Sequence, residues 1–425
     1  MMATTKKDKL AIDGGAKTLS TPLPAWPQFD RRTDRRVLEI LHSGRVNYWT
    51  GPIGHEFEMA FASWLGVKHA VSVTNGTAAL HVALAALGIG SGDEVICTPY
   101  SFIASSFCAL QAGAMPVFCD VGEDHILDAA KLEALITPRT KAIVVVHLYG
   151  VVAEMTPILK IAKRHHIAVI EDCAQCLGGV YKGRKVGTLG TIGCFSFCQS
   201  KHFTTAGEGG MVCTNSAALA KEIRALRDHG REEKSAAEKK AVHGANPFTY
   251  RRVGYNLRMT EIQSVVGLGE LKRFDSWNLP RRVKYGKALI KGLANHPLVR
   301  LAPIDTASRQ NSFWLVPFVL RPELLRVSVL DFIRAVQAEG VGAYAILWPT
   351  MYKEPAFTAR GGFGSRNYPF DDPASPQIDY SKVDCPVAQE LAAHTIGFWV
   401  HPTYSLQHIR AAIRAFNKVY NAYKK

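Results

Sequence analysis

The sequence predicts an α/β protein in which a large domain, built on a mostly parallel sheet covered by helices, precedes a smaller C-terminal α+β domain. Short apolar segments alternate with helical segments between residues 70 and 173, which is typical of parallel sheets buried on both faces. A long helical stretch over 258–293 then separates this alternation from a second region with strands of its own. The chain has 425 residues, of which 47% are hydrophobic and 20% charged, and this is enough for two domains.

The first thirty residues are expected to form an extended N-terminal arm, because Pro22, Pro24 and Pro27 exclude a regular helix. Trp26 is the residue expected to anchor this arm. Two helices that pack on the larger body follow. The first covers DRRVLEILHSG and ends at Gly44, and the second covers HEFEMAFASWLG.

Strands and helices then alternate along the chain. Strands are predicted in the segments AVSV, EVICT, PVFCDV, KAIVVV, IAVIEDC, GCFSF and MVCTN, and most of them are followed by a helical segment. Ligands of such sheets bind at the carboxyl ends of the strands. We therefore expect the functional residues where these strands end.

The rest of the chain contains one polar insertion, one bridging helix and the second domain. Residues 231–248 are the most polar stretch and are predicted to be a solvated insertion. The helical stretch after them should lead into the smaller domain, which begins with the strand-like NSFWLVPFVL and closes with a helix over 405–423. The predicted parts are the arm at 1–30, a large domain at 31–285 and a small domain at 286–425.

Composition excludes several classes of protein. The formal net charge of +15 favours anionic ligands in general, but no helix-turn-helix, zinc-finger or RNP-type pattern is present, so nucleic-acid binding is not predicted. The apolar runs are too short to cross a bilayer and the N-terminus has no apolar signal core, so the expected location is the cytoplasm, away from membranes.

The nine cysteines mostly lie in apolar segments, as expected in a reducing compartment. Cys173 and Cys176 form a C-x-x-C motif, with Cys194 and Cys198 as candidate partners for a zinc ion. Because the second pair is C-x-x-x-C and the turns of a zinc ribbon are missing, no metal site is predicted.

The first motif that carries chemistry is a strand followed by Asn75, Gly76 and Thr77 and then by an apolar helix. A helix that begins at such a turn points free backbone N–H groups and its positive dipole end at a ligand, which favours a phosphate site. Thr77 could instead be an ordinary N-cap that needs no ligand. This motif alone leaves both interpretations open.

The second motif is the apolar strand IAVIEDCAQ, which ends in Glu171, Asp172 and Gln175. A carboxylate at the end of a buried strand needs a cationic partner, and a protonated pyridine nitrogen would serve. The alternative is an aspartate that caps the following turn.

The third motif, SFCQSKHFTTAGEGG, places Ser196 five residues before Lys201 and a glycine-rich turn after it. A lysine here would be costly to bury unless its ammonium is used, and Schiff-base formation with a carbonyl is one such use. A phosphate cradle, a pyridinium partner and a Schiff-base lysine, each after its own strand, are what pyridoxal phosphate requires.

The motifs NGTAALHVAL, GDEVI, GAMPVFCDV, VHLYG, EDCAQ, SFCQSKHFTTAGEGG and GYNLRM occur in the order shown by one known family. The chain resembles the DegT/DnrJ/StrS group of pyridoxal-phosphate-dependent sugar aminotransferases, which have the aspartate-aminotransferase fold (fold type I). The similarity extends from about Leu23 to the end.

The resemblance implies a role for each matching residue. Lys201 would hold the cofactor as a Schiff base and move the proton, and Asp172 would pair with the pyridine nitrogen. Gln175 would bind the phenolic oxygen and Phe102 would stack on the ring. The phosphate would be held by Gly76, Thr77 and Ser196, and by Asn256 of a neighbouring subunit, so the active unit would be a homodimer.

The resemblance also implies the reaction. Glutamate or glutamine would convert the cofactor to pyridoxamine 5'-phosphate, which would then aminate a nucleotide-linked keto-sugar, a keto-sugar phosphate or an inosose. Related sugar dehydratases carry histidine where this chain has Lys201, which favours transamination here. A sugar dehydratase, an aminohydroxybenzoate-synthase-like enzyme and a cofactor-binding sensor without turnover remain the alternatives.

Overall fold

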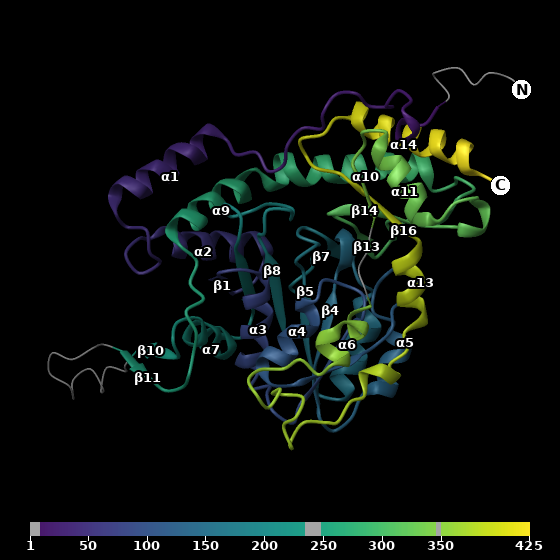
Figure 1. Cartoon of the computed structure of the whole chain (residues 1–425). Coiled ribbons are helices and arrows are strands. Elements are labelled where there is room, and N and C mark those ends of the chain that lie inside the picture. The colour runs from purple at the N-terminus through teal and green to yellow at the C-terminus, as the bar shows by residue number, and fades with distance from the viewer. Residues whose placement is uncertain (1–8, 234–247, 346–349) are drawn as a thin grey trace, which may run out of the picture.

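A seven-stranded sheet forms the centre of the computed structural model, which describes residues 9–233, 248–345 and 350–425 (Figure 1). Six of its strands run in the same direction, and β9 lies antiparallel to both of its neighbours, β1 and β8. In spatial order the strands are β1 (His69–Val73), β9 (Gly210–Thr214), β8 (Ile192–Ser196), β5 (Ala168–Asp172), β4 (Thr140–Val146), β2 (Glu94–Cys97) and β3 (Met115–Phe118).

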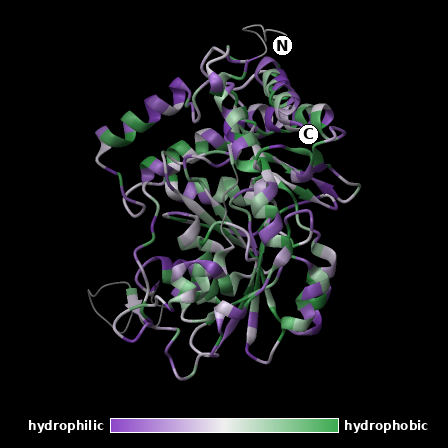
Figure 2. Cartoon of the chain, turned by 45° about the vertical axis from the view of Figure 1, so that its right-hand side comes forward, coloured by the Kyte–Doolittle hydropathy of each residue, from purple (hydrophilic) through white to green (hydrophobic). Residues whose placement is uncertain are grey.

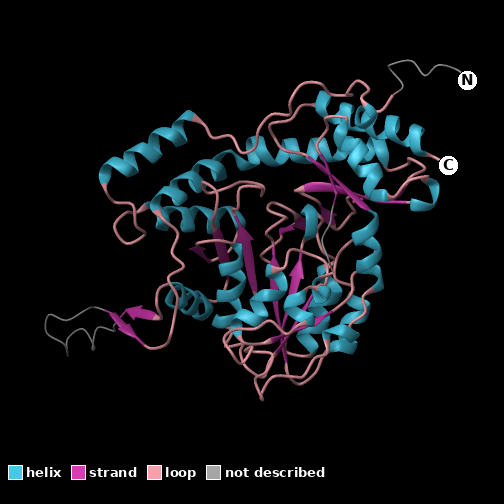
Figure 3. Ribbon diagram, viewed as in Figure 1, coloured by secondary structure: helices cyan, strands magenta, loops and turns pink. Residues whose placement is uncertain are grey.

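Successive side chains of each strand enter different hydrophobic cores, because a strand alternates its side chains between the two faces of the sheet. In β4, Ile143 and Val145 lie in one core, whereas Ala142 and Val144 lie in the other. Helices cover both faces (Figure 3). They are α2 (Ile53–Leu65), α3 (Gly76–Ala86), α4 (Ala104–Ala112), α5 (Ala129–Leu132), α6 (Met155–Arg164), α7 (Ala217–Arg227) and α9 (Glu261–Arg273).

A smaller antiparallel sheet lies beyond the first one and has a core of its own with the helices α10, α11 and α14. The strands of both sheets are mainly hydrophobic, whereas the surface helices alternate hydrophobic and hydrophilic residues (Figure 2). The second sheet contains β12 (Val299–Leu301), β14 (Leu315–Leu320), β16 (Thr395–Trp399) and β15 (Ala343–Ala345), and its helices are α10 (Leu279–Leu293), α11 (Val329–Ala338) and α14 (Leu406–Tyr423).

Three segments connect the two parts of the molecule. A π-helix, Phe274–Asn278, joins α9 to α10, so the predicted bridging helix is continuous in direction but changes its winding. The arm is fastened to the small sheet's helices by Glu339, whose carboxylate accepts hydrogen bonds from the backbone N–H groups of Ala11 and Thr18. Residues between 351 and 391, with α12 (Pro355–Thr358) and α13 (Pro386–His394), return to the first core.

The predicted fold class is confirmed, and the first two predicted helices are present as α1 (Arg31–Ser43) and α2. Gly44 ends α1 in a left-handed conformation, with φ of 68°. The ends of the polar insertion form a short hairpin, β10 (Arg231–Glu233) and β11 (Phe248–Tyr250), in which the Arg231 guanidinium packs on Phe248. Residues 234–247 lie outside the described ranges, and the predicted domain boundaries stay predictions.

A third, three-stranded sheet has β6 (Val180–Tyr181) at its centre, paired with β7 (Arg184–Lys185) on one side and with β13 (Arg309–Gln310) on the other. Within the described ranges, no helix is both long enough and apolar enough to cross a membrane.

Candidate active site

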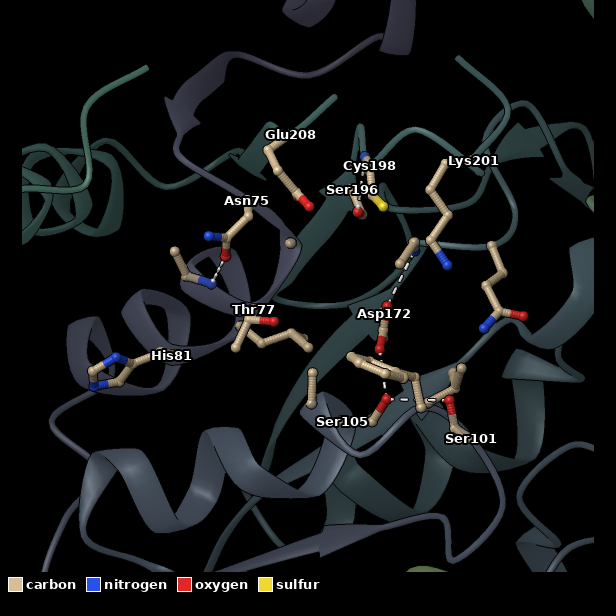
Figure 4. A pocket seen from close by; sticks show the side chains of 18 of the residues that line it. Asn75, Thr77, His81, Ser101, Ser105, Asp172, Ser196, Cys198, Lys201 and Glu208 are labelled. Carbon is tan, nitrogen blue, oxygen red and sulfur yellow. Dashed lines mark hydrogen bonds between the residues drawn. The ribbon is translucent and has the colours of Figure 1, made fainter. Parts of the chain in front are cut away.

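Seven of the eight predicted site residues line one pocket of about 740 Å³ at the carboxyl ends of β2, β4, β5 and β8. Loops and helix starts bring them together, although they are spread over more than a hundred residues of sequence. Figure 4 shows Asp172 near the centre of this pocket, between Ser105 and Lys201. The seven residues are Gly76, Thr77, Phe102, Asp172, Gln175, Ser196 and Lys201.

The start of α3 forms one end of the pocket. Asn75 caps this helix, because its side-chain oxygen accepts a hydrogen bond from the N–H of Ala78 at 2.8 Å. The alternative that Thr77 is the N-cap is therefore wrong, and its hydroxyl is not needed for capping. Gly76 lies so close to β8 that a Cβ atom on it would be 2.6 Å from the Cβ of Ser196. The free N–H groups, the Thr77 hydroxyl and the Ser196 hydroxyl thus meet at a helix N-terminus that suits a phosphate.

Asp172 is buried at the end of β5 and both of its carboxylate oxygens are engaged. Ser105 Oγ donates to Oδ2 at 2.8 Å, and the N–H of Ala174 donates to Oδ1 at 3.1 Å. The bond to Ala174 is the turn-capping contact of the alternative interpretation. Burial raises the pKa of Asp172, and the hydrogen bond from Ser105 opposes this rise. A cationic group in the pocket would compensate the buried charge.

Gln175 is buried beside the same strand end, and Tyr149 orients its amide. The N–H of Tyr149 donates to Gln175 Oε1 at 3.0 Å. Since this bond occupies the carbonyl oxygen, the NH₂ group of Gln175 is the part that remains to donate to a ligand. An anionic oxygen atom, such as a phenolate, is a suitable acceptor.

Among the described residues that line the pocket, Lys201 is the one lysine, and there is no arginine. Its Nζ lies 4.3 Å from the centre of the Trp314 ring. Burial lowers the pKa of Lys201, and the Coulombic attraction of Asp172 opposes this shift. A lysine with a lowered pKa holds more of the neutral amine that attacks a carbonyl.

Two predicted residues lie at the margin of the site. Phe102 lines the pocket but is 52% exposed, so its ring is partly open to solvent. Asn256 does not line the pocket; it is exposed and its backbone pairs with Asp228. Its neighbour Leu257 does line the pocket, and its carbonyl accepts a hydrogen bond from the N–H of Thr74.

Sequence reasoning missed several residues of the pocket wall, among them Ser105, Trp314, His81 and Glu208. Ser105 lies in the segment that follows the predicted strand EVICT, and this position could have suggested it as a site residue. Trp314 comes from the small sheet, and no spacing in the sequence places it near Lys201. His81 carries a buried Nε2 for which the described ranges offer no hydrogen-bond partner. The sequence could not indicate this residue, because α3 approaches the pocket only in the folded chain.

Metal-ligating side chains of three residues lie close together behind the site: His147, Glu171 and Cys173. Hydrogen bonds within the protein already account for two of them. The N–H of Ala153 donates to His147 Nδ1 at 3.0 Å, so the Nε2–H of His147 donates to Glu171, also at 3.0 Å. Glu171 also accepts from three backbone N–H groups of residues 187–190. This group therefore holds the strand end that carries Asp172.

The pocket fits pyridoxal phosphate on the chemistry of its donors. One end offers free N–H and hydroxyl groups at the Gly76–Ser196 contact, and the buried Asp172 carboxylate would meet the pyridinium. The Gln175 NH₂ group would face the phenolic oxygen, and the amine of Lys201 would meet the aldehyde. The phosphate, the pyridinium, the phenolic oxygen and the aldehyde of the cofactor thus each have a matching group in the pocket.

Comparisons with known proteins identify related chains. The chain is 46% identical over 255 residues to GDP-perosamine synthase of Caulobacter vibrioides, a match that spans 59% of this chain and 64% of that relative, less than two thirds of its length. It is 35% identical to L-glutamine:2-deoxy-scyllo-inosose aminotransferase of Streptomyces lividus over 91% of both chains. The solved structure of an aminotransferase from Psychrobacter cryohalolentis superposes with a TM-score of 0.85 at 35% identity, covering 94% of this chain and 99% of that one.

A model of the DegT/DnrJ/EryC1/StrS aminotransferase family matches residues 27–396. This match confirms the predicted resemblance, the enzyme class and the pyridoxal phosphate cofactor. The chain therefore belongs to the DegT/DnrJ/EryC1/StrS aminotransferase family.

Proposed function

We propose that the protein moves an amino group from glutamine or glutamate to a ketone on a cyclitol or sugar, with Lys201 as the residue that binds the cofactor and transfers the proton. The observation that carries this proposal is the pocket in which a lysine of lowered pKa faces a buried aspartate. When bound, pyridoxal phosphate supplies the aldehyde that accepts the amino group and the ring that withdraws electrons.

The chain's own residues would divide the remaining work. Lys201 Nζ would take a proton from the donor's carbon and return one to the acceptor's carbon, as general base and then acid. Asp172 would keep the ring nitrogen protonated, and its bonds to Ser105 and Ala174 would hold it in place. Gly76, Thr77 and Ser196 would fix the phosphate end, so that the reacting carbon meets Lys201 at a constant position.

The charge of the pocket supports a neutral acceptor. Among its described lining residues, Lys201 is the one lysine and there is no arginine, whereas a nucleotide diphosphate would bring two negative charges into the same space. The relatives that match over 91% of both chains act, by their names, on 2-deoxy-scyllo-inosose with L-glutamine as donor. An inosose-type ketone and glutamine are therefore the proposed substrates.

A nucleotide-linked keto-sugar is the second candidate. It is favoured by the 46% identity to GDP-perosamine synthase. In that case the cations that bind the diphosphate would have to come from outside the described lining of this chain.

We also propose a homodimer with shared sites. Asn256 is exposed and lies outside the pocket of its own chain, on a segment pinned by the backbone bond from Thr74 to Leu257. An asparagine held in this way can reach the phosphate site of a second copy. The predicted cytoplasmic location stays a prediction.

The test is a product screen. The purified protein is incubated with amide-labelled and amine-labelled ¹⁵N-glutamine and with a panel of inososes, keto-sugar phosphates and nucleotide-linked keto-sugars, and products are identified by mass spectrometry. We expect the amine label in an aminocyclitol. Loss of a hydroxyl without gain of nitrogen would support a dehydratase instead, and the absence of any turnover over the panel would support a sensor.

A further inference from the structure

The loop that carries Lys201 contains neither helix nor strand, yet side chains from three distant segments bind three consecutive carbonyl groups in it. The indole N–H of Trp314 donates to the carbonyl of Ser200 at 2.6 Å, and that of Trp26 donates to the carbonyl of Lys201 at 3.3 Å. The side-chain amide of Asn278 donates to the carbonyl of His202 at 2.6 Å. A lysine on irregular backbone is thus held by tertiary contacts instead of by its own secondary structure.

A fully buried arginine ties these donors together. Arg282 donates to Asn278 Oδ1 at 2.8 Å, and to the carbonyl oxygens of Trp314 and His202 at 3.4 Å each. Its guanidinium also lies 5.1 Å from the centre of the Trp26 ring. All the hydrogen bonds found for Arg282 in the described chain therefore go to the lysine loop or to the residues that hold it. We call Trp26, Asn278, Arg282 and Trp314 the lysine clamp.

The clamp joins parts of the molecule that otherwise belong to different units. Trp26 is in the N-terminal arm, which Glu339 fastens beside the small sheet, and Trp314 directly precedes β14 of that sheet. Asn278 ends the π-helix between α9 and α10, and such turns frequently occur at functional sites. Trp314 contacts Lys201 twice, since its N–H binds the preceding carbonyl and its ring faces Nζ at 4.3 Å.

We propose that Trp26, Asn278, Arg282 and Trp314 are positioning residues that fix Lys201 for proton transfer, and that the arm is thereby a part of the active site. This inference rests on the proposed role of Lys201. An ammonium on an indole face is stabilised by the ring's negative face, and a one-ångström error in the position of a reacting group is costly in rate. The clamp supplies both the position of Nζ and part of its electrostatic surroundings.

The test uses the full chain loaded with pyridoxal phosphate and the variants Trp26→Phe and Trp314→Phe, which keep an aromatic ring and remove the N–H donor. The matched control is Trp64→Phe. Trp64 Nε1 donates to Asp275 Oδ2 at 2.9 Å, in the same π-helix, and no hydrogen bond or ring contact is found between Trp64 and the lysine loop in the described part of the chain. Thermal unfolding, the pH titration of the cofactor's visible absorbance, kcat and KM are measured for each.

We expect Trp26→Phe to lower kcat by about 3- to 10-fold, the equivalent of one hydrogen bond, with the acceptor's KM changed by less than about twofold. Trp314→Phe should also lower the pKa of the lysine-linked chromophore, because phenylalanine attracts a cation less than tryptophan does. Trp64→Phe should change only the melting temperature.

The proposal is overturned if both clamp variants match Trp64→Phe in the absorbance titration and in kcat. Should Trp314→Phe fold poorly, Trp26→Phe alone decides, since the arm lies on the surface of the folded body. A Lys201→Ala protein that transfers amino groups at the wild-type rate would instead refute the proposed function, so the two failures are distinguishable.

Discussion

A single methyl group at Gly76 tests whether the start of α3 is the phosphate site. In Gly76→Ala the new Cβ would lie 2.6 Å from the Cβ of Ser196 and 3.3 Å from its Cα. Carbon atoms pack at about 3.5 to 4.0 Å, so the start of α3 and the end of β8 must separate by about 1 Å. This movement lengthens the bonds that the N–H and hydroxyl groups make to a phosphate. One hydrogen bond to a charged group contributes about 1.5 to 3 kcal/mol, which predicts cofactor binding about 10- to 100-fold weaker.

Cofactor titration followed by absorbance measures this effect. The control is Gly90→Ala, where the nearest atom to a Cβ is the carbonyl oxygen of Ala112 at 3.6 Å, an ordinary contact. The melting temperature of the cofactor-free variants separates a local change from a folding defect, since overpacking can cost about 1 to 3 kcal/mol by itself. Binding by Gly76→Ala within twofold of the wild type, with Gly90→Ala unchanged as well, would refute the phosphate cradle.

Three further predictions concern the carboxylates. Asp172→Asn should bind pyridoxal phosphate more weakly and lower kcat by at least about 100-fold, because the ring nitrogen loses its anionic partner; unchanged kinetics would remove the proposed role of Asp172. Ser105→Ala should raise the pKa of Asp172 and move the acidic limb of the kcat/KM profile to higher pH, whereas Ser106→Ala, whose hydroxyl bonds Ile103, should not. Burial opposes ionisation of Glu171, but the hydrogen bonds from His147 and the backbone hold its pKa below the usual 4.5. The ionised carboxylate therefore stabilises the folded state above pH 4.5, and this stabilisation is lost as the pH falls below that value. Glu171→Gln should therefore lose about 3 kcal/mol of unfolding free energy at pH 7. In urea titrations at a series of pH values, this loss should become progressively smaller as the pH falls below 4.5; a loss that stays constant below pH 4.5 would contradict the assignment.

Local patterns in the sequence were sufficient to predict the sheet, most of the helices and the residues that line the pocket at its strand ends. Apolar strands that end in Asp172 and Ser196 must bring these side chains to one edge, because parallel strands share that edge. The sequence could not show whether Asn75 or Thr77 is the N-cap of α3, since both residue types are good caps. The backbone conformation decides which of them takes this role.

The contacts that depend on long-range packing were not accessible from sequence. Trp26 was expected to anchor the arm, but nothing in the sequence shows that its N–H binds the carbonyl of Lys201. Trp314 is more than a hundred residues from Lys201, and its position follows from how the small sheet sits on the large one. The π-helix likewise could not be distinguished from an α-helix in the sequence, because its residues are compatible with both.

The most direct test of the central claim is the half-reaction of Lys201→Ala. The wild type and the variant are loaded with pyridoxamine phosphate and mixed with an inosose or keto-sugar that the wild type accepts, and the return of the pyridoxal absorbance is followed by stopped flow. A matched control is Lys163→Ala, an exposed lysine on α6. The proposed function predicts that Lys163→Ala reacts like the wild type while Lys201→Ala is slower by at least about 1,000-fold. Return of the absorbance in Lys201→Ala at the wild-type rate would contradict it.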